Sequence, residues 1–168
     1  MNTRTLRIRP ARPADASGIS EVHDAAWREA YRGIIPGREL ERMMMRRGPL
    51  WWRRLLSSRA RVIVLDFDDR VAGYVTYGPS RMRLLPYGGE IFELYLAPEF
   101  QGLGFGRRLF RAARHALAEE GYPATIVWAL APNERAVAFY EKLGGLAVVR
   151  RHERIDEVEI ERIGFGWA

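Results

Sequence analysis

The stretch that decides the fold is Pro98-Glu99-Phe100-Gln101-Gly102-Leu103-Gly104-Phe105-Gly106-Arg107-Arg108-Leu109. Its three glycines alternate with other residues and join an apolar run to an amphipathic one. Glycine permits unusual φ angles and lets a ligand approach the backbone closely, and successive N–H groups at a helix N-terminus form a socket for an anion. Two arginines follow at this electropositive helix end, where cations are unfavourable unless an anion offsets them. The stretch therefore predicts a phosphate-binding loop.

Two common nucleotide-binding loops do not fit this stretch. A dinucleotide-binding fingerprint needs GxGxxG. Counted from Gly102, the position of the third glycine holds Arg107, and counted from Gly104 it holds Leu109. A P-loop needs a glycine followed by a lysine, and no such pair occurs here. The pattern that does fit is Q-x-x-G-x-G, from Gln101 to Gly106.

The segments around the loop predict a strand, a helix and a second strand. Residues 91–96 read as a strand, the helix that follows the loop has an apolar stripe from Phe105 to Leu117, and residues 125–130 read as a second strand. Such a crossover makes the two strands parallel. Further strands are predicted at 6–9, 62–67, 71–77, 146–150 and 158–165, and further helices at 19–30, 40–45, 50–56 and 133–143. The fold class is therefore α/β, a mixed sheet with helices on both faces.

The helix from Asn133 carries a second candidate ligand face. Asn133 and Tyr140 are seven residues apart, so both lie on one face of the helix, with the small Ala136 between them. Taken alone, Asn133 reads as an N-cap and Tyr140 as a core aromatic. Behind a phosphate loop, we interpret the face as one along which a slender ligand lies.

Composition narrows the class of protein. The 168 residues fit a single domain spanning residues 1–168, and the hydrophobic and charged fractions of 48% and 29% are those of a soluble globular protein. The N-terminus is polar and unlike a signal peptide, and no apolar run approaches the roughly 20 residues that span a bilayer. We therefore expect a cytoplasmic protein without a membrane partner.

Residue usage limits the chemistry. The chain has no cysteine, so an acyl group cannot pass through a cysteinyl intermediate. Its three histidines, His23, His115 and His152, have no ligand-like spacing, and we expect no metal. Arginine supplies 26 of the 27 basic residues, and the net charge is +6. This basicity reflects either genome base composition or an anionic partner. A nucleic-acid-binding module is the alternative reading, but no nucleic-acid-binding motif supports it.

The motifs together resemble the GNAT (GCN5-related N-acetyltransferase) superfamily. The Q-x-x-G-x-G loop resembles that family's pyrophosphate loop, and Asn133 to Gly144, with its Phe-Tyr-x-x-x-Gly ending, resembles its second hallmark. The resemblance covers roughly residues 62–165. It implies a mostly antiparallel sheet of six or seven strands, about four flanking helices and a parallel pair splayed by a bulge. It also implies transfer of an acetyl group from acetyl-CoA directly to a primary amine of a small molecule or peptide.

The resemblance also implies how the donor is held. Backbone groups of Leu94, Tyr95 and Leu96 would bond the pantetheine arm like an added strand. The pyrophosphate would bind the loop, and Asn133 would contact the pantetheine or acceptor side. Tyr140 would bind the donor and protonate the departing thiolate. The implied loop residues are Gln101, Gly102, Leu103, Gly104, Phe105, Gly106 and Arg107.

The attacking amine must lose a proton, because a free alkylamine is largely protonated near neutral pH. Glu90 and Glu93 are the candidate bases, and strand alternation predicts that they lie on opposite faces of the sheet. Several family members carry a catalytic carboxylate at the position that matches Glu90, which makes it the first choice. Water, His23 or Tyr31 remain alternatives.

The acceptor side is expected in the N-terminal helices. Trp27 and Tyr31 are candidate acceptor-binding residues, although both also suit a core. The acceptor itself stays open among small amines, amino acids, antibiotics and protein N-termini. A CoA-binding sensor without catalysis is a further alternative. Members of the family that the chain resembles are often dimers, so a homodimer is a further expectation, with Phe165 and Trp167 as exposed interface residues.

Overall fold

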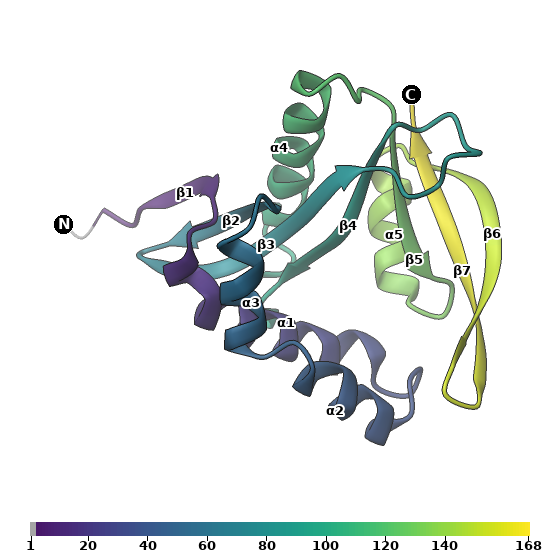
Figure 1. The fold of residues 1–168 in the computed structure, drawn as a ribbon, viewed down its shortest axis with the longest axis horizontal. Coiled ribbons are helices and arrows are strands. Elements are labelled where there is room, and N and C mark those ends of the chain that lie inside the picture. Colours follow the sequence, from purple (N-terminus) through teal and green to yellow (C-terminus); the bar gives the residue numbers. More distant parts are fainter. Residues whose placement is uncertain (1–2) are drawn as a thin grey trace.

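The computed structural model describes residues 3–168, and its elements follow the order that the sequence predicts (Figure 1). Within these residues there are seven strands and five α-helices, one helix more than the resemblance implies. The strands are β1 (Leu6–Pro10), β2 (Arg61–Phe67), β3 (Arg70–Pro79), β4 (Gly89–Leu96), β5 (Thr125–Leu130), β6 (Leu146–Ile155) and β7 (Val158–Trp167). The helices are α1 (Ala16–Tyr31), α2 (Gly37–Met45), α3 (Pro49–Leu56), α4 (Phe105–Glu119) and α5 (Glu134–Lys142).

The strands form one sheet in the order β1-β2-β3-β4-β5-β7-β6. Every neighbouring pair is antiparallel except β4 and β5, which α4 connects as a parallel crossover. The predicted α/β class, with a mixed and mostly antiparallel sheet, is confirmed.

The parallel pair β4–β5 separates after three residues. Only Gly89–Ile91 pairs with β5, opposite Thr125–Val127. On its other side β4 contains a bulge: Glu93 pairs with Thr76 and Ile91 with Tyr77, so Phe92 is an extra residue. A bulge bends its strand and increases the local twist. The predicted splay is therefore present, and the β5-facing edge of β4 has no strand partner beyond Ile91.

Helices cover both faces of the sheet, with α4 on one face and α1 and α3 on the other (Figure 1). On α4, Leu109, Ala113 and Leu117 recur every four residues, and all three are fully buried. Gly73 of β3 leaves room for this contact, because a Cβ there would lie 2.4 Å from Leu96 and 3.1 Å from Leu109. Helix α5 packs on the same side as α4, through Tyr140 and its neighbours.

The α1–α2 region packs against the β6–β7 hairpin through a separate apolar cluster. Ile35, Leu40 and Met44 from the helical side meet Ile160 of β7, with Trp27 at the margin. This cluster joins the N-terminal helices to the C-terminal strands across the splayed end of β4 and β5.

The prediction that Phe165 and Trp167 are exposed is wrong. Their exposed fractions are 0% and 7%, and the Trp167 indole N–H donates to the Leu143 carbonyl at 3.0 Å. Strand β7 lies between β5 and β6, so these two side chains fill the core. Within the described residues, no helix is long and apolar enough to cross a membrane.

Candidate active site

The three glycines of the loop serve two different purposes. Gly102 and Gly104 have φ angles of +75° and +83°, and a Cβ at either position would meet no protein atom. Both conformations are left-handed, which glycine adopts without steric penalty. A Cβ on Gly106 would instead lie 3.1 Å from the Phe139 ring, so this glycine allows α4 to pack closely against α5.

The loop presents a row of free amides. Among residues 3–168, no protein group accepts a hydrogen bond from the N–H groups of Gly102 through Arg107, and the first helical bond joins Arg108 N to Gly104 O at 3.4 Å. Helix α4 spans 15 residues behind them, and Arg107 and Arg108 are exposed in its first turn. An anion is the ligand that such a helix terminus suits.

Gln101 ties this loop to the end of β4. Its side-chain amide donates to the Leu96 carbonyl at 3.1 Å, while its Oε1 is buried with no hydrogen-bond partner in the described chain. The Gln101 side chain thus links the start of the loop to the last residue of β4.

The free edge of β4 continues from the loop. Ala97 N donates to Ala72 O of β3 at 2.9 Å, and the backbone groups of successive strand residues point to opposite neighbours. Leu94 and Leu96 therefore direct their backbone groups to the unpaired edge, whereas Tyr95 directs its own to β3. The Tyr95 side chain lies on the α1 face instead.

Asn133 lies at the start of α5, and Tyr140 lies on its buried face. Asn133 caps the helix, since its Oδ1 accepts from Ala136 N at 3.3 Å. Tyr140 is buried against Phe110, Phe165 and other core aromatics. Burial, with a smaller contribution from Tyr31, raises the pKa of the Tyr140 phenol well above its usual range. The phenol therefore keeps its proton.

The expectation that Glu90 and Glu93 lie on opposite faces of the sheet is wrong. Glu90 pairs with Gly78 and Glu93 with Thr76, and these partners are two residues apart on β3, so they share a face. Strict alternation would place Glu90 and Glu93, three residues apart, on opposite faces. Because Phe92 is an extra residue in the bulge, Glu93 lies on the same face as Glu90. Both carboxylates thus lie on the α1 face.

The two carboxylates differ in access. Glu90 is 1% exposed, and its two oxygens accept from the backbone N–H of Arg81 at 3.1 Å and from the Arg81 guanidinium at 2.7 Å. The Arg81 guanidinium lies 4.6 Å from the centre of the Phe92 ring, over the bulge. The side chain of Glu93 is 14% exposed, which leaves it the more accessible of the two.

Glu93 is held by two side chains that sequence reasoning did not identify. The Arg47 guanidinium donates to both carboxylate oxygens, at 3.0 Å for the Nη2–Oε2 bond. The Tyr74 hydroxyl donates to Oε2 at 2.9 Å. Only Tyr74 left a signal in the sequence, as a polar-tipped residue within an apolar strand. Nothing in the sequence marks Arg47 among its neighbouring arginines.

The predicted acceptor residues lie on α1 above this carboxylate. The Tyr31 and Tyr95 hydroxyls are 2.7 Å apart and share a hydrogen bond. The Trp27 ring packs edge-on to Tyr31, with ring centroids 5.3 Å apart. Its centroid lies 4.5 Å from that of the His23 ring. The structure thus brings Trp27, Tyr31 and Glu93 into one region.

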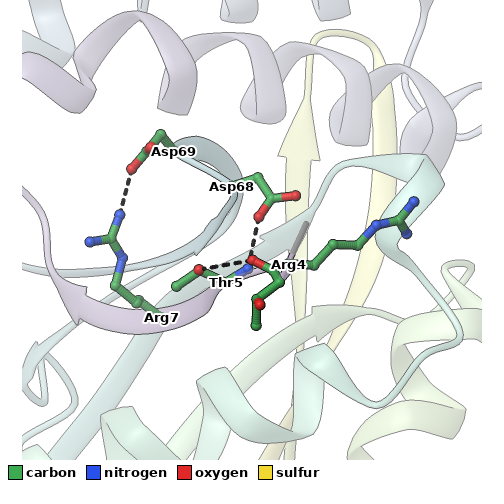
Figure 2. Close-up of a pocket in the computed structure, with 6 residues that line it drawn as sticks. Arg4, Thr5, Arg7, Asp68 and Asp69 are labelled. Carbon is green, nitrogen blue, oxygen red and sulfur yellow. Dashed lines mark hydrogen bonds and ion pairs between the residues drawn. The ribbon is translucent and has the colours of Figure 1, made fainter. Parts of the chain in front are cut away.

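A hollow at the far end of β1 shares no residue with this site (Figure 2). It is lined by the N-terminal segment and by the turn between β2 and β3. Arg7 contacts Asp69 at 2.5 Å, and Asp68 accepts from Thr5 N at 2.7 Å. The Arg4 side chain extends away from both carboxylates (Figure 2). We therefore assign it no role. Among the residues that the structure describes, no three acidic or histidine side chains gather as metal ligands.

Comparisons with known proteins identify the family of this chain. The model of the Acetyltransferase (GNAT) family matches residues 19–145, more than half of the chain. The N-acetyltransferase YuaI of Bacillus subtilis is 28% identical over 162 residues, which is 96% of this chain and 92% of YuaI. The probable N-acetyltransferase Rv2775 of Mycobacterium tuberculosis is 27% identical and aligns over 84% of this chain and 80% of its own. The chain therefore belongs to the GNAT family of acetyltransferases, which confirms the predicted family and enzyme class.

Solved structures show the same fold. The PaiA N-acetyltransferase of Thermoplasma acidophilum, crystallised with coenzyme A, has a TM-score of 0.74 at 18% identity, over 95% of this chain and 98% of that one. YncA of Salmonella typhimurium, solved with acetyl-CoA, has a TM-score of 0.70 at 18% identity, over 97% and 93% of the two chains.

Proposed function

We propose that this enzyme is an acetyl-CoA-dependent N-acetyltransferase that transfers the acetyl group directly to a primary amine. The observation that carries the proposal is the row of six free amides, Gly102 through Arg107, beside the unpaired edge of β4. This arrangement suits a ligand with a diphosphate at one end and an extended amide-bearing arm at the other. The ligand-bound structures of PaiA and YncA support the same choice of donor.

The residues present fit this donor. The loop amides and the positive end of α4 would hold the pyrophosphate. The backbone groups of Leu94 and the N–H of Leu96 would pair with the pantetheine arm, whereas the Leu96 carbonyl is bonded to Gln101. Asn133, which caps α5, would contact this arm or the acceptor side. When bound, acetyl-CoA supplies the acetyl group as a thioester, which an uncharged amine can attack.

Two tasks then fall to residues of the chain: accepting a proton from the attacking amine and stabilising the departing thiolate. The acceptor approaches on the α1 face, where Glu93 has the exposure and Glu90 is closed off by Arg81. We therefore favour Glu93, directly or through water, as the group that receives the amine proton. Tyr140 retains its proton because burial raises its pKa, so its Oη would offer a hydrogen bond to a departing thiolate.

A ligand-binding experiment tests the proposal before any acceptor is known. At about 100 times its Kd, acetyl-CoA should stabilise the protein by about 2.7 kcal/mol, which raises the Tm by roughly 5–10 °C at this size. ATP, which has phosphates but no pantetheine arm, is the control and should have a smaller effect. No shift with acetyl-CoA would contradict the proposal.

Two further readouts separate the alternatives. Release of free CoA across a panel of amines, amino acids and peptides distinguishes an enzyme from a sensor that binds CoA without transfer. A nucleic-acid-binding module would instead show steep salt dependence of DNA or RNA retention.

A further inference from the structure

The hydrogen bonds of Glu93 leave one acceptor position free. An ionised carboxylate has about four lone-pair positions. Arg47 Nη1 occupies one on Oε1, while Arg47 Nη2 and the Tyr74 hydroxyl both approach Oε2. One position on Oε1 therefore remains for a donor that comes from the partly exposed side of the carboxylate.

The Arg47 guanidinium is directed at Glu93, and its Nε is buried without a hydrogen-bond partner in the described chain. The guanidinium donates hydrogen bonds to both oxygens of Glu93. It also stacks on two tryptophans, 4.3 Å from the Trp51 ring centre and 4.8 Å from that of Trp52. Its side chain is only 19% exposed. The guanidinium thus fixes Glu93 in place and is itself held between that carboxylate and the two tryptophan rings.

The surroundings of Glu93 are aromatic and largely shielded from solvent. Trp27 lies 5.3 Å from Tyr31 and 6.3 Å from Tyr95, centroid to centroid. Burial is the main cause that raises the pKa of both tyrosines, and burial lowers the pKa of His23, which keeps it neutral. Aromatic faces attract both an ammonium group and an aromatic body.

We propose that the acceptor is a primary amine on an aromatic or apolar body, with no carboxylate beside the amino group. The amino group donates to the free position of Glu93, the body packs against Trp27, Tyr31 and Tyr95, and Arg47 is a positioning residue that acts through Glu93. A carboxylate next to the amine would meet the negative Glu93 with Arg47 already engaged. This inference rests on the proposed N-acetyltransferase function and narrows its substrate class.

Matched pairs of acceptors test the substrate class. Phenethylamine and phenylalanine differ only in the carboxylate, as do tyramine and tyrosine. Release of CoA thiol from acetyl-CoA is measured for each, and we expect kcat/KM to be at least tenfold higher for the amine of each pair. Equal or faster turnover of the amino acids would overturn the inference. So would no turnover of any of the four while acetyl-CoA still raises the Tm. Loss of the acetyl-CoA effect would instead contradict the proposed function itself.

A double-mutant cycle with phenethylamine tests the role of Arg47. If Arg47 acts through Glu93, then Arg47→Met and Glu93→Gln each lower kcat/KM for the amine by about tenfold or more, and the double variant loses no more than the worse single one. The KM for acetyl-CoA should stay the same in all three. Losses that multiply in the double variant, or a parallel rise in the KM for acetyl-CoA, would contradict the assignment.

Two further variants separate positioning from folding. Tyr74→Phe removes the remaining hydrogen bond to Glu93 with little change in volume, so it should lower kcat/KM in the same direction if Arg47→Met does not fold. Arg61→Met removes a different Arg–Glu contact, with Glu120 on the other side of the sheet at 2.7 Å, and should leave kcat/KM unchanged. If the Tyr74→Phe variant is as active as the natural protein, the hydrogen bonds that position Glu93 do not matter for the amine, and the inference is contradicted.

Discussion

The donor side and the acceptor side of this enzyme are built from different kinds of groups. On the donor side, the loop at 101–107 and the free edge of β4 offer backbone amides and carbonyls. On the acceptor side, Glu93 and the aromatic residues offer side chains from α1, β3, β4 and the connection between α2 and α3. Backbone recognition depends on local conformation, which glycines mark in the sequence. Side-chain recognition depends on which distant segments meet.

The largest effect is expected where the backbone carries the binding. In Gly104→Ala, the residue must leave its φ of +83° or bear the strain of a left-handed conformation, which costs an L-residue roughly 1–2 kcal/mol. Displacing the loop amides removes at least one hydrogen bond to a charged phosphate. We expect acetyl-CoA affinity, measured by calorimetry, to fall by about 10- to 100-fold.

Gly121 provides the matched control for this variant. It has a φ of +93° just after α4, and a Cβ there would also meet no protein atom. Gly121→Ala should therefore lose similar stability but keep its acetyl-CoA affinity. Equal loss of affinity in both variants would mean that the loop amides are not the binding groups, and the contrast between the two sides would fail.

The next effect concerns turnover, at the point where the two sides meet. Tyr140→Phe removes the hydroxyl of a buried side chain whose ring packing remains. If that hydroxyl donates a proton, kcat should fall by about 100-fold or more, while the acetyl-CoA affinity stays nearly the same. Tyr122→Phe, the same change just before β5, is the control. Full turnover by Tyr140→Phe would remove this residue from the mechanism.

The contrast between local backbone features and distant side-chain contacts also explains which parts of the fold and the site the sequence predicts. The strand order, the crossover and the loop follow from hydrophobic periodicity and glycine placement, both of which act over short stretches of chain. The bulge at Phe92 has no such mark, because the run Glu90–Leu96 contains neither glycine nor proline. It arises from the pairing of β4 with β3, and it moves Glu90 and Glu93 onto one face.

The acceptor side was the hardest part to predict for the same reason. Arg47 and Glu93 are 46 residues apart, and no spacing rule connects a residue between two helices to one on a strand. The burial of Trp167 was missed because a C-terminal strand at the edge of a sheet and one inside it have similar sequences. Its position between β5 and β6 is a property of the topology.

The smallest effect compares a buried histidine of the acceptor side with an exposed one on α4. His23, beneath Trp27 on the acceptor side, is 0% exposed, whereas His115 on α4 is 75% exposed. Burial lowers the pKa of His23 from its ordinary value of 6.5; Arg47 acts in the same direction, and Asp24 and Glu93 oppose it. The unfolded chain therefore binds this proton more tightly than the folded one, so stability is present above about pH 6.5 and is lost as the pH falls below it.

His23→Met removes this proton-binding site and keeps the position apolar. Between pH 7.5 and pH 5.5, the Tm of the natural protein should fall by more than that of the His23→Met variant. His115→Gln should follow the natural protein, since its side chain is exposed to solvent. Parallel falls in the natural protein and in His23→Met would mean that His23 accepts a proton without loss of folding. The apolar character inferred for the acceptor side would then need a different explanation, because a charged imidazolium beside Trp27 would be tolerated there.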